Sequence, residues 1–179
     1  TLFPYTTLFH LINNLGTLPP LPPNLTMLLC NTNELETLPA LPSSLRDLYC
    51  KDNQLIKLPT LPPSLERLEC RENELAELPA LSSKMTLLSC DDNKLTQLPK
   101  LPPSLKVLYC SSNQLTSLPE LPSSLTELYC YDNQLTVLPN LPPRMTALDC
   151  TGNQITSWPP IPPTCRVLQS REEEFYGVG

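Results

Sequence analysis

The chain has 179 residues, enough for one domain, and its formal net charge is −6 at pH 7. Such an acidic chain without a stripe of Lys and Arg argues against nucleic-acid binding, because neutralising phosphates is the first requirement of that function. No apolar run approaches the ~20 residues of a membrane span, which argues against membrane insertion.

Residues 1–20 form a degenerate first unit of a repeat that becomes regular afterwards. His10 stands where later units carry Cys, and we expect this single histidine to play a packing or solvent-facing role, not a catalytic one. The chain does not begin with Met, and TLFPYTTLF at its start resembles a peptide that sequencing-adapter read-through introduces into metagenomic translations. We therefore expect a metagenomic fragment whose residues 1–9 are artefactual.

Residues 21–160 contain seven units of 20 residues without insertion or deletion, such as LPPSLKVLYCSSNQLTSLPE from Leu101 to Glu120. Asn and Cys each recur once per unit, at Asn33, Asn53, Asn73, Asn93, Asn113, Asn133 and Asn153, and three residues earlier from Cys30 to Cys150. A fixed period of this length predicts a solenoid, in which each turn of chain stacks on the previous turn to bury a shared apolar core.

Each unit contains a short segment in which apolar and polar residues alternate. In Asp47 to Lys51, the apolar Leu48 and Cys50 alternate with more polar residues, which predicts a short strand buried on one face. Stacked turns would place these strands in one long parallel sheet. The recurring Asn follows each strand, and we expect its side-chain amide to satisfy backbone groups of adjacent turns.

The rest of each unit is the proline-rich return segment LPxLP. Proline fixes φ, lacks an N–H and favours extended geometry at the residue before it, so this segment cannot be helical. We expect a polyproline II-like convex side with Leu58 and Leu61 pointing inward.

Residues 161–179 form a degenerate C-terminal repeat or cap. The pattern predicts that Leu168 stays in register and that Cys165 takes the core position of Leu45. The polar run REEE at residues 171–174 suits a solenoid cap, but a truncated unit explains it equally well.

This LxxLxxNxLxxLP skeleton resembles the leucine-rich repeats, over about Leu11 to Leu168. Its 20-residue length and LPxLP return are similar to the bacterial class of YopM-like effectors and IpaH-type ubiquitin ligases. The resemblance implies a right-handed solenoid with parallel strands on the concave face and little or no helix. It departs from that class in the inward Cys, in the missing helical cap before the repeats and in the missing ligase domain after them.

Eight cysteines raise the question of disulfides or a metal site. Side chains of stacked parallel strands fit disulfide torsions poorly, and one Cys per turn inside a core makes no tetrahedral zinc site. We expect small buried hydrophobic residues, no metal and no cofactor. Buried thiols weakly favour a reducing compartment, either a bacterial cytoplasm or a host cytosol after secretion.

The outward strand positions form the concave face, where residues that differ between turns are free to bind a partner. Tyr109 and Tyr129 should be adjacent across strands, and exposed tyrosines are enriched at binding hot spots; the alternative is that aromatic residues simply suit such strand positions. The corresponding alternative for the charged residues is that Arg67, Glu69 and Arg71 neutralise one another's charges across the sheet and bind no partner. The candidate partner-binding residues are Tyr49, Lys51, Arg67, Glu69, Arg71, Tyr109, Tyr129, Tyr131 and Asp149.

Catalytic chemistry has no support in the sequence. There is no Ser/His/Asp or Cys/His constellation and no phosphate-binding glycine loop. We expect Asp91, Asp92 and Asp132 to be exposed, with no apolar pocket to shift their pKa values. A calcium-binding row at the position of Asp52 is interrupted by Ser112 and Gly152.

The sequence thus predicts a monomeric, non-enzymatic module that binds a partner protein on its concave face. By resemblance, it would be the recognition part of a secreted bacterial effector. The alternatives are the recognition fragment of an E3 ubiquitin ligase whose catalytic domain lies outside this chain, and a surface-exposed leucine-rich-repeat protein.

Overall fold

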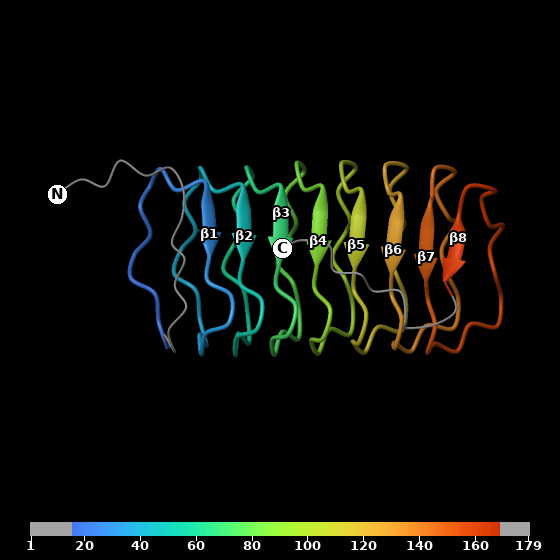
Figure 1. Ribbon diagram of the computed structural model, residues 1–179, viewed down its shortest axis with the longest axis horizontal. Coiled ribbons are helices and arrows are strands. Elements are labelled where there is room, and N and C mark those ends of the chain that lie inside the picture. Colours follow the sequence, from blue (N-terminus) through green and yellow to red (C-terminus); the bar gives the residue numbers. More distant parts are fainter. Residues whose placement is uncertain (1–15, 169–179) are drawn as a thin grey trace.

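The computed structural model describes residues 16–168, which wind into a solenoid with one eight-stranded parallel sheet (Figure 1). The strands follow one another in chain order along the sheet, and each is three residues long. They are β1 (Met27–Leu29), β2 (Asp47–Tyr49), β3 (Arg67–Glu69), β4 (Leu87–Ser89), β5 (Val107–Tyr109), β6 (Glu127–Tyr129), β7 (Ala147–Asp149) and β8 (Arg166–Leu168). No helix occurs within the described range.

The register confirms the 20-residue period for seven of the strands. Leu28 lies beside Leu48 between β1 and β2, and the same step continues to Leu128 beside Leu148 between β6 and β7. Each of the strands β1 to β7 therefore presents the same unit positions to the next in this series, and the alternation of side chains sends one row inward and the next outward.

The last strand departs from this register. Leu148 pairs with Val167 and Asp149 pairs with Leu168, so the prediction that Leu168 stays in register is wrong by one residue. Register is strongly specified only where one face of a strand is buried. Val167 and Leu168 are only half-buried, and burial therefore holds this strand less firmly than the ones before it.

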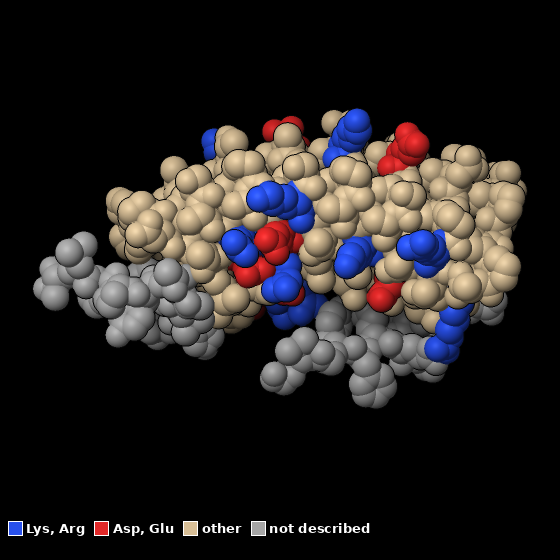
Figure 2. Space-filling model, turned by 90° about the horizontal axis from the view of Figure 1, so that it is seen from above, with Lys and Arg blue, Asp and Glu red and all other residues tan. Residues whose placement is uncertain are grey.

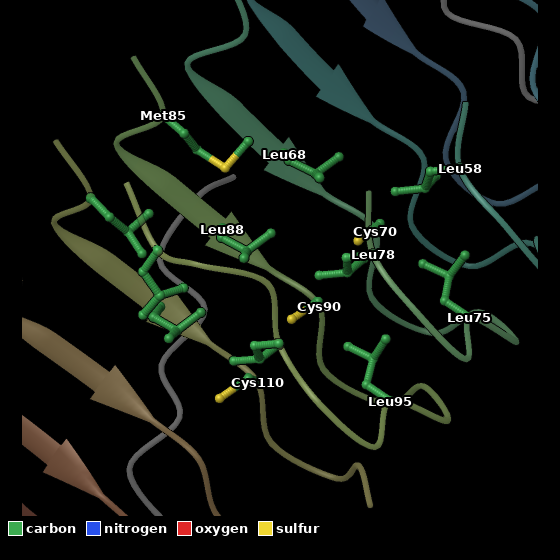
Figure 3. Packing of buried hydrophobic residues seen from close by; sticks show 14 of the residues in the cluster. Leu58, Leu68, Cys70, Leu75, Leu78, Met85, Leu88, Cys90, Leu95 and Cys110 are labelled. Atoms are coloured by element: carbon green, nitrogen blue, oxygen red, sulfur yellow. The ribbon is translucent and has the colours of Figure 1, made fainter. Parts of the chain in front are cut away.

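The core is a continuous column of Leu and Cys side chains enclosed by the turns (Figure 3). Leu68, Leu88 and Leu108 are fully buried, as are Cys70, Cys90 and Cys110, which point into the interior from successive turns. Leu58 and Leu61 are also buried, which confirms the inward positions predicted for the return segment. Because neighbours must stack to form this column, stability is shared among interfaces between turns.

The seven cysteines that directly follow β1 to β7 are buried, as predicted, and all eight cysteines are free thiols. Burial raises the pKa of the Cys30 thiol to about 12 and that of Cys150 to about 11. Cys165 is only half-buried but packs against the core, so its predicted core position is partly reached.

The recurring asparagines form the predicted ladder between turns. Asn73 donates from Nδ2 to the main-chain oxygens of Cys50 at 3.0 Å and Cys70 at 3.1 Å, while its Oδ1 accepts from the N–H of Leu55 at 2.9 Å. One side chain thus satisfies backbone groups of two turns that would otherwise be buried without partners.

The residue before each asparagine has a left-handed backbone. φ is between 51° and 56° at Thr32, Asp52, Glu72, Asp92, Ser112 and Asp132, and it is 64° at Gly152. This conformation turns the chain away from the sheet a few residues after each strand. The strands are three residues long, in agreement with the short strand that the alternating pattern predicted.

The domain division into residues 1–20, 21–160 and 161–179 remains a prediction. The assignments made for His10 and for the REEE run lie outside the described residues.

Candidate functional site

Two tyrosines stack at the centre of the concave face. Tyr109 on β5 lies directly beside Tyr129 on β6 in the sheet register. Their ring centroids are 4.8 Å apart and the ring planes differ by 12°. The centroid separation matches the ~4.8 Å spacing of strands in a sheet, so the rings stack along the solenoid axis. This confirms the predicted adjacency of the two residues.

Glu127 completes this group, and the candidate residues predicted from the sequence did not include it. The Tyr129 hydroxyl donates to Glu127 Oε2 at 3.3 Å. Burial, followed by the negative charge of Glu127, raises the pKa of Tyr129 to about 12, so its hydroxyl remains a proton donor at neutral pH. The spacing of two residues along one strand, which puts side chains on the same face, was the available signal.

Tyr131 lies two residues beyond β6 and is buried, with 9% of its surface exposed. This differs from the open outward position expected from the alternation. The chain has already left the sheet at this point, since Asp132 adopts the left-handed turn. Tyr131 therefore contributes less surface to a partner than the stacked pair, which is half-buried.

The charged candidates gather on β2 and β3, away from the tyrosine stack. Arg67 Nη1 lies 3.1 Å from Asp47 Oδ1, and the pKa of Arg67 is raised by a hydrogen bond with Tyr49 and then by the Asp47 charge. Lys51 Nζ lies 3.6 Å from Glu72 Oε1. The sheet register places Glu69 between Tyr49 and Ser89, whereas the ion pair of Arg67 is with Asp47 on the preceding strand.

Of the remaining candidates, Arg71 lies two residues beyond β3 and Asp149 lies on β7. The main-chain oxygen of Arg71 accepts from Asp52 N–H at 3.0 Å and from Asn73 Nδ2 at 3.2 Å. Asp149, on β7 beside Tyr129, is buried, and its Oδ1 accepts from the N–H and the hydroxyl of Thr151. The structure therefore brings Tyr109, Tyr129 and Asp149 together on neighbouring strands and leaves Tyr49, Lys51 and Arg67 as a separate group.

The prediction for Asp91 is wrong. Its side chain is only 6% exposed, and burial raises its pKa from 3.8 to about 6 even though hydrogen bonds act in the opposite direction. Asp91 Oδ1 accepts from the N–H of Ser111 at 2.8 Å, and Oδ2 accepts from the Ser89 hydroxyl at 3.2 Å. The small Ser89 and Ser111 side chains let this carboxyl settle against the sheet, which the repeat pattern does not reveal.

A metal site, a membrane-spanning helix or a surface of one charge would indicate another function for the described part of the chain. No group of three metal-ligating side chains occurs there. Nor does it contain any helix whose length and apolar character would suit a membrane crossing. Seen from above, acidic and basic side chains lie intermixed over the middle of the solenoid, without a surface of one sign (Figure 2).

The fold and this repeat agree with what comparison with known proteins finds. A family model described as leucine-rich repeats (2 copies) matches residues 103–140. The leucine-rich-repeat domain of a Shigella effector is 35% identical, with a TM-score of 0.72, and the alignment covers 80% of this chain and 67% of that domain. The chain belongs to the leucine-rich-repeat family. No curated protein sequence matches it significantly.

Two structures of the leucine-rich-repeat effector YopM are also similar. YopM from Yersinia enterocolitica is 44% identical with a TM-score of 0.85, and YopM from Yersinia pestis is 37% identical with a TM-score of 0.77. Both alignments cover 87% of this chain, which spans 35% and 48% of the respective YopM chains. This leucine-rich-repeat solenoid is thus of the bacterial effector type, and such solenoids are generally binding scaffolds without catalytic activity.

Proposed function

We propose that this leucine-rich-repeat protein binds a partner protein on its concave face, with the stacked Tyr109 and Tyr129 at the centre of the contact. It would serve as the recognition part of a bacterial effector and carry no catalytic activity of its own. The observation that carries the proposal is the stack itself, which is half-buried and lies on β5 and β6 within the sheet.

The scaffold does not require these tyrosines. The same unit position carries Leu29, Glu69, Ser89 and Asp149 in other turns, and those strands pair in the same way, although β2 also carries a tyrosine there, Tyr49. Rigid aromatic side chains supply a large contact area at a small cost in conformational entropy, which is why tyrosine is enriched at binding hot spots. The likeness to YopM and to the Shigella effector domain supports an interaction role for the whole solenoid.

The test begins with capture of proteins from a eukaryotic cell lysate on the immobilised full chain, followed by binding measurements with each purified candidate. Tyr129→Ala should weaken binding about thirtyfold or more, because hot-spot truncations cost about 2 kcal/mol or more. The circular dichroism spectrum should be unchanged. Ile56→Ala is the matched control, since Ile56 is 60% exposed and lies outside the strands.

A partner that binds Tyr109→Ala and Tyr129→Ala as tightly as the original chain would remove the tyrosine stack from the site. Loss of binding with Ile56→Ala alone would place the interaction on another face.

A further inference from the structure

The concave face divides into two regions of different charge. From β4 to β7, the outward strand positions and the residues two beyond each strand include the carboxylates Asp91, Glu127 and Asp149 but no Lys or Arg. Basic residues border this region on both sides, with Arg67 on β3 beside Leu87 and Arg166 on β8 beside Ala147. The tyrosine stack therefore lies in the acidic region of the face.

Two carboxylates near β2 and β3 have cationic partners, whereas Glu69 on β3 and the carboxylates around the stack form no such pair within the described residues. Asp47 pairs with Arg67, and Glu72 pairs with Lys51. Within the described residues, no ion pair joins Glu127, Asp149 or Asp91 to a basic side chain. Buried charges are normally paired, so Asp149, at 3% exposure with only the neutral donors of Thr151, is an unusual feature of the sheet.

The stacking geometry directs one ring face of Tyr129 towards this unpaired charge. The other face of the ring lies against Tyr109, on the β5 side. The second face is therefore turned towards β7, where Asp149 is the register partner of Tyr129. Beside it, the register partner of Glu127 is Ala147, which has a small side chain and lies between Glu127 and Arg166.

A further polar group in the region has no partner. Ser111, two residues beyond β5, is fully buried, and its hydroxyl oxygen forms no hydrogen bond with any residue that the structure describes. It stands between Asp91 and Tyr131 in the row of residues that follow the strands. A hydroxyl oxygen is an acceptor for the same N–H donors that a carboxylate attracts.

We propose that the region from β5 to β7 recognises an arginine side chain of the partner protein, with the guanidinium over the outer ring face of Tyr129 and beside the carboxylate of Glu127. This inference rests on the proposed partner-binding function and adds the chemistry of the partner. A planar guanidinium stacks on an aromatic ring and donates in its own plane to a carboxylate, a combination that a lysine ammonium does not offer. The unpaired charge of Asp149 adds attraction from beneath.

The test uses the full chain and a fluorescein-labelled hexa-arginine peptide as the probe, followed by anisotropy at moderate salt. Tyr129→Leu, which removes the ring but keeps an apolar side chain, should weaken binding about fivefold to thirtyfold. Tyr129→Phe keeps the ring and should stay within about threefold of the original chain. Glu127→Gln should weaken binding about fivefold or more, because it removes the charge and keeps the shape.

A matched control distinguishes recognition at Tyr129 and Glu127 from a general electrostatic attraction of the peptide to an acidic protein. Glu120→Gln changes the net charge by the same amount at an exposed position in the return segment before β6, and it should alter binding less than twofold. A hexa-citrulline peptide, which has the same shape without the charge, should bind far more weakly than hexa-arginine.

The proposal is overturned if Glu127→Gln and Glu120→Gln have equal effects, if Tyr129→Leu binds like the original chain, or if hexa-arginine does not bind. Any of these outcomes leaves the partner-binding proposal standing whenever capture of a purified partner still depends on Tyr129. The partner would then present a different chemistry to the stack.

Discussion

Asn113 Nδ2 donates a hydrogen bond of 3.0 Å to the main-chain oxygen of Cys90, which lies 23 residues earlier in the chain. The same amide donates to the oxygens of Cys110 and Ser111, and Asn113 Oδ1 accepts from the N–H of Leu95. One buried side chain therefore forms hydrogen bonds with backbone groups of two successive turns.

Asn113→Ala should reduce the free energy of unfolding by about 2–4 kcal/mol, because it leaves several buried backbone groups without partners. Urea denaturation followed by circular dichroism measures the change. Gln114→Ala alters an exposed neighbour and should cost less than about 0.5 kcal/mol. Equal losses for the two variants would show that the asparagine ladder is not a main source of stability.

The thiols should differ in reactivity according to their burial. Desolvation raises the pKa of each of the seven cysteines that follow β1 to β7. Their reactive thiolate form is therefore scarce near neutral pH in the folded state. With Ellman's reagent at about pH 8, we expect the half-buried Cys165 to react first and all eight cysteines to react after denaturation.

Cys165→Ser is the control for this assignment and should abolish the fast phase. A titration that finds fewer than eight thiols in the denatured, unreduced protein would contradict the free-cysteine structure.

Asp91 should make stability depend on pH. Its folded pKa of about 6 lies above its ordinary value of 3.8, so the folded state binds the proton more tightly than the unfolded chain. The stabilisation is therefore fully present below about pH 4 and is lost as the pH rises through about 6. We expect this group to remove about 1–3 kcal/mol of stability between pH 4 and pH 7.

Asp91→Asn keeps the acceptor for Ser111 N–H and removes the titration, so this part of the pH dependence should vanish from urea denaturation curves. Asp92→Asn changes an exposed neighbour and should retain it. An unchanged pH dependence in Asp91→Asn would mean that Asp91 is not buried in solution.

Thr32→Gly should stabilise the protein. Thr32 holds a φ of 54° with a β-branched side chain, a conformation that glycine adopts without steric cost. Relief of this strain should exceed the added entropy of the unfolded chain and give about 0.5–1 kcal/mol. Thermal and urea unfolding measure the gain. Thr37→Gly, at an exposed residue without positive φ, should give no gain; a less stable Thr32→Gly would contradict the argument.

The repeated features of this protein could be predicted because every turn makes the same contacts with its neighbours. The inward positions of Leu58 and Leu61, the burial of the cysteines and the role of the asparagines all follow from one unit that must stack on itself. The adjacency of Tyr109 and Tyr129 follows as well, since a fixed period places equal unit positions side by side.

The solenoid, the parallel sheet and the inward positions of the repeated Leu and Cys residues follow from the amino-acid pattern alone, because periodic apolar side chains are buried only when the turns stack. The pairing of Arg67 with Asp47, the burial of Asp91 and Tyr131 and the shifted register of Leu168 become visible only in the folded chain. These depend on residues that differ between turns, where side-chain size and charge on neighbouring strands select among several arrangements. The same is true of Glu127 at the tyrosine stack, whose carboxylate is placed by one hydrogen bond with Tyr129.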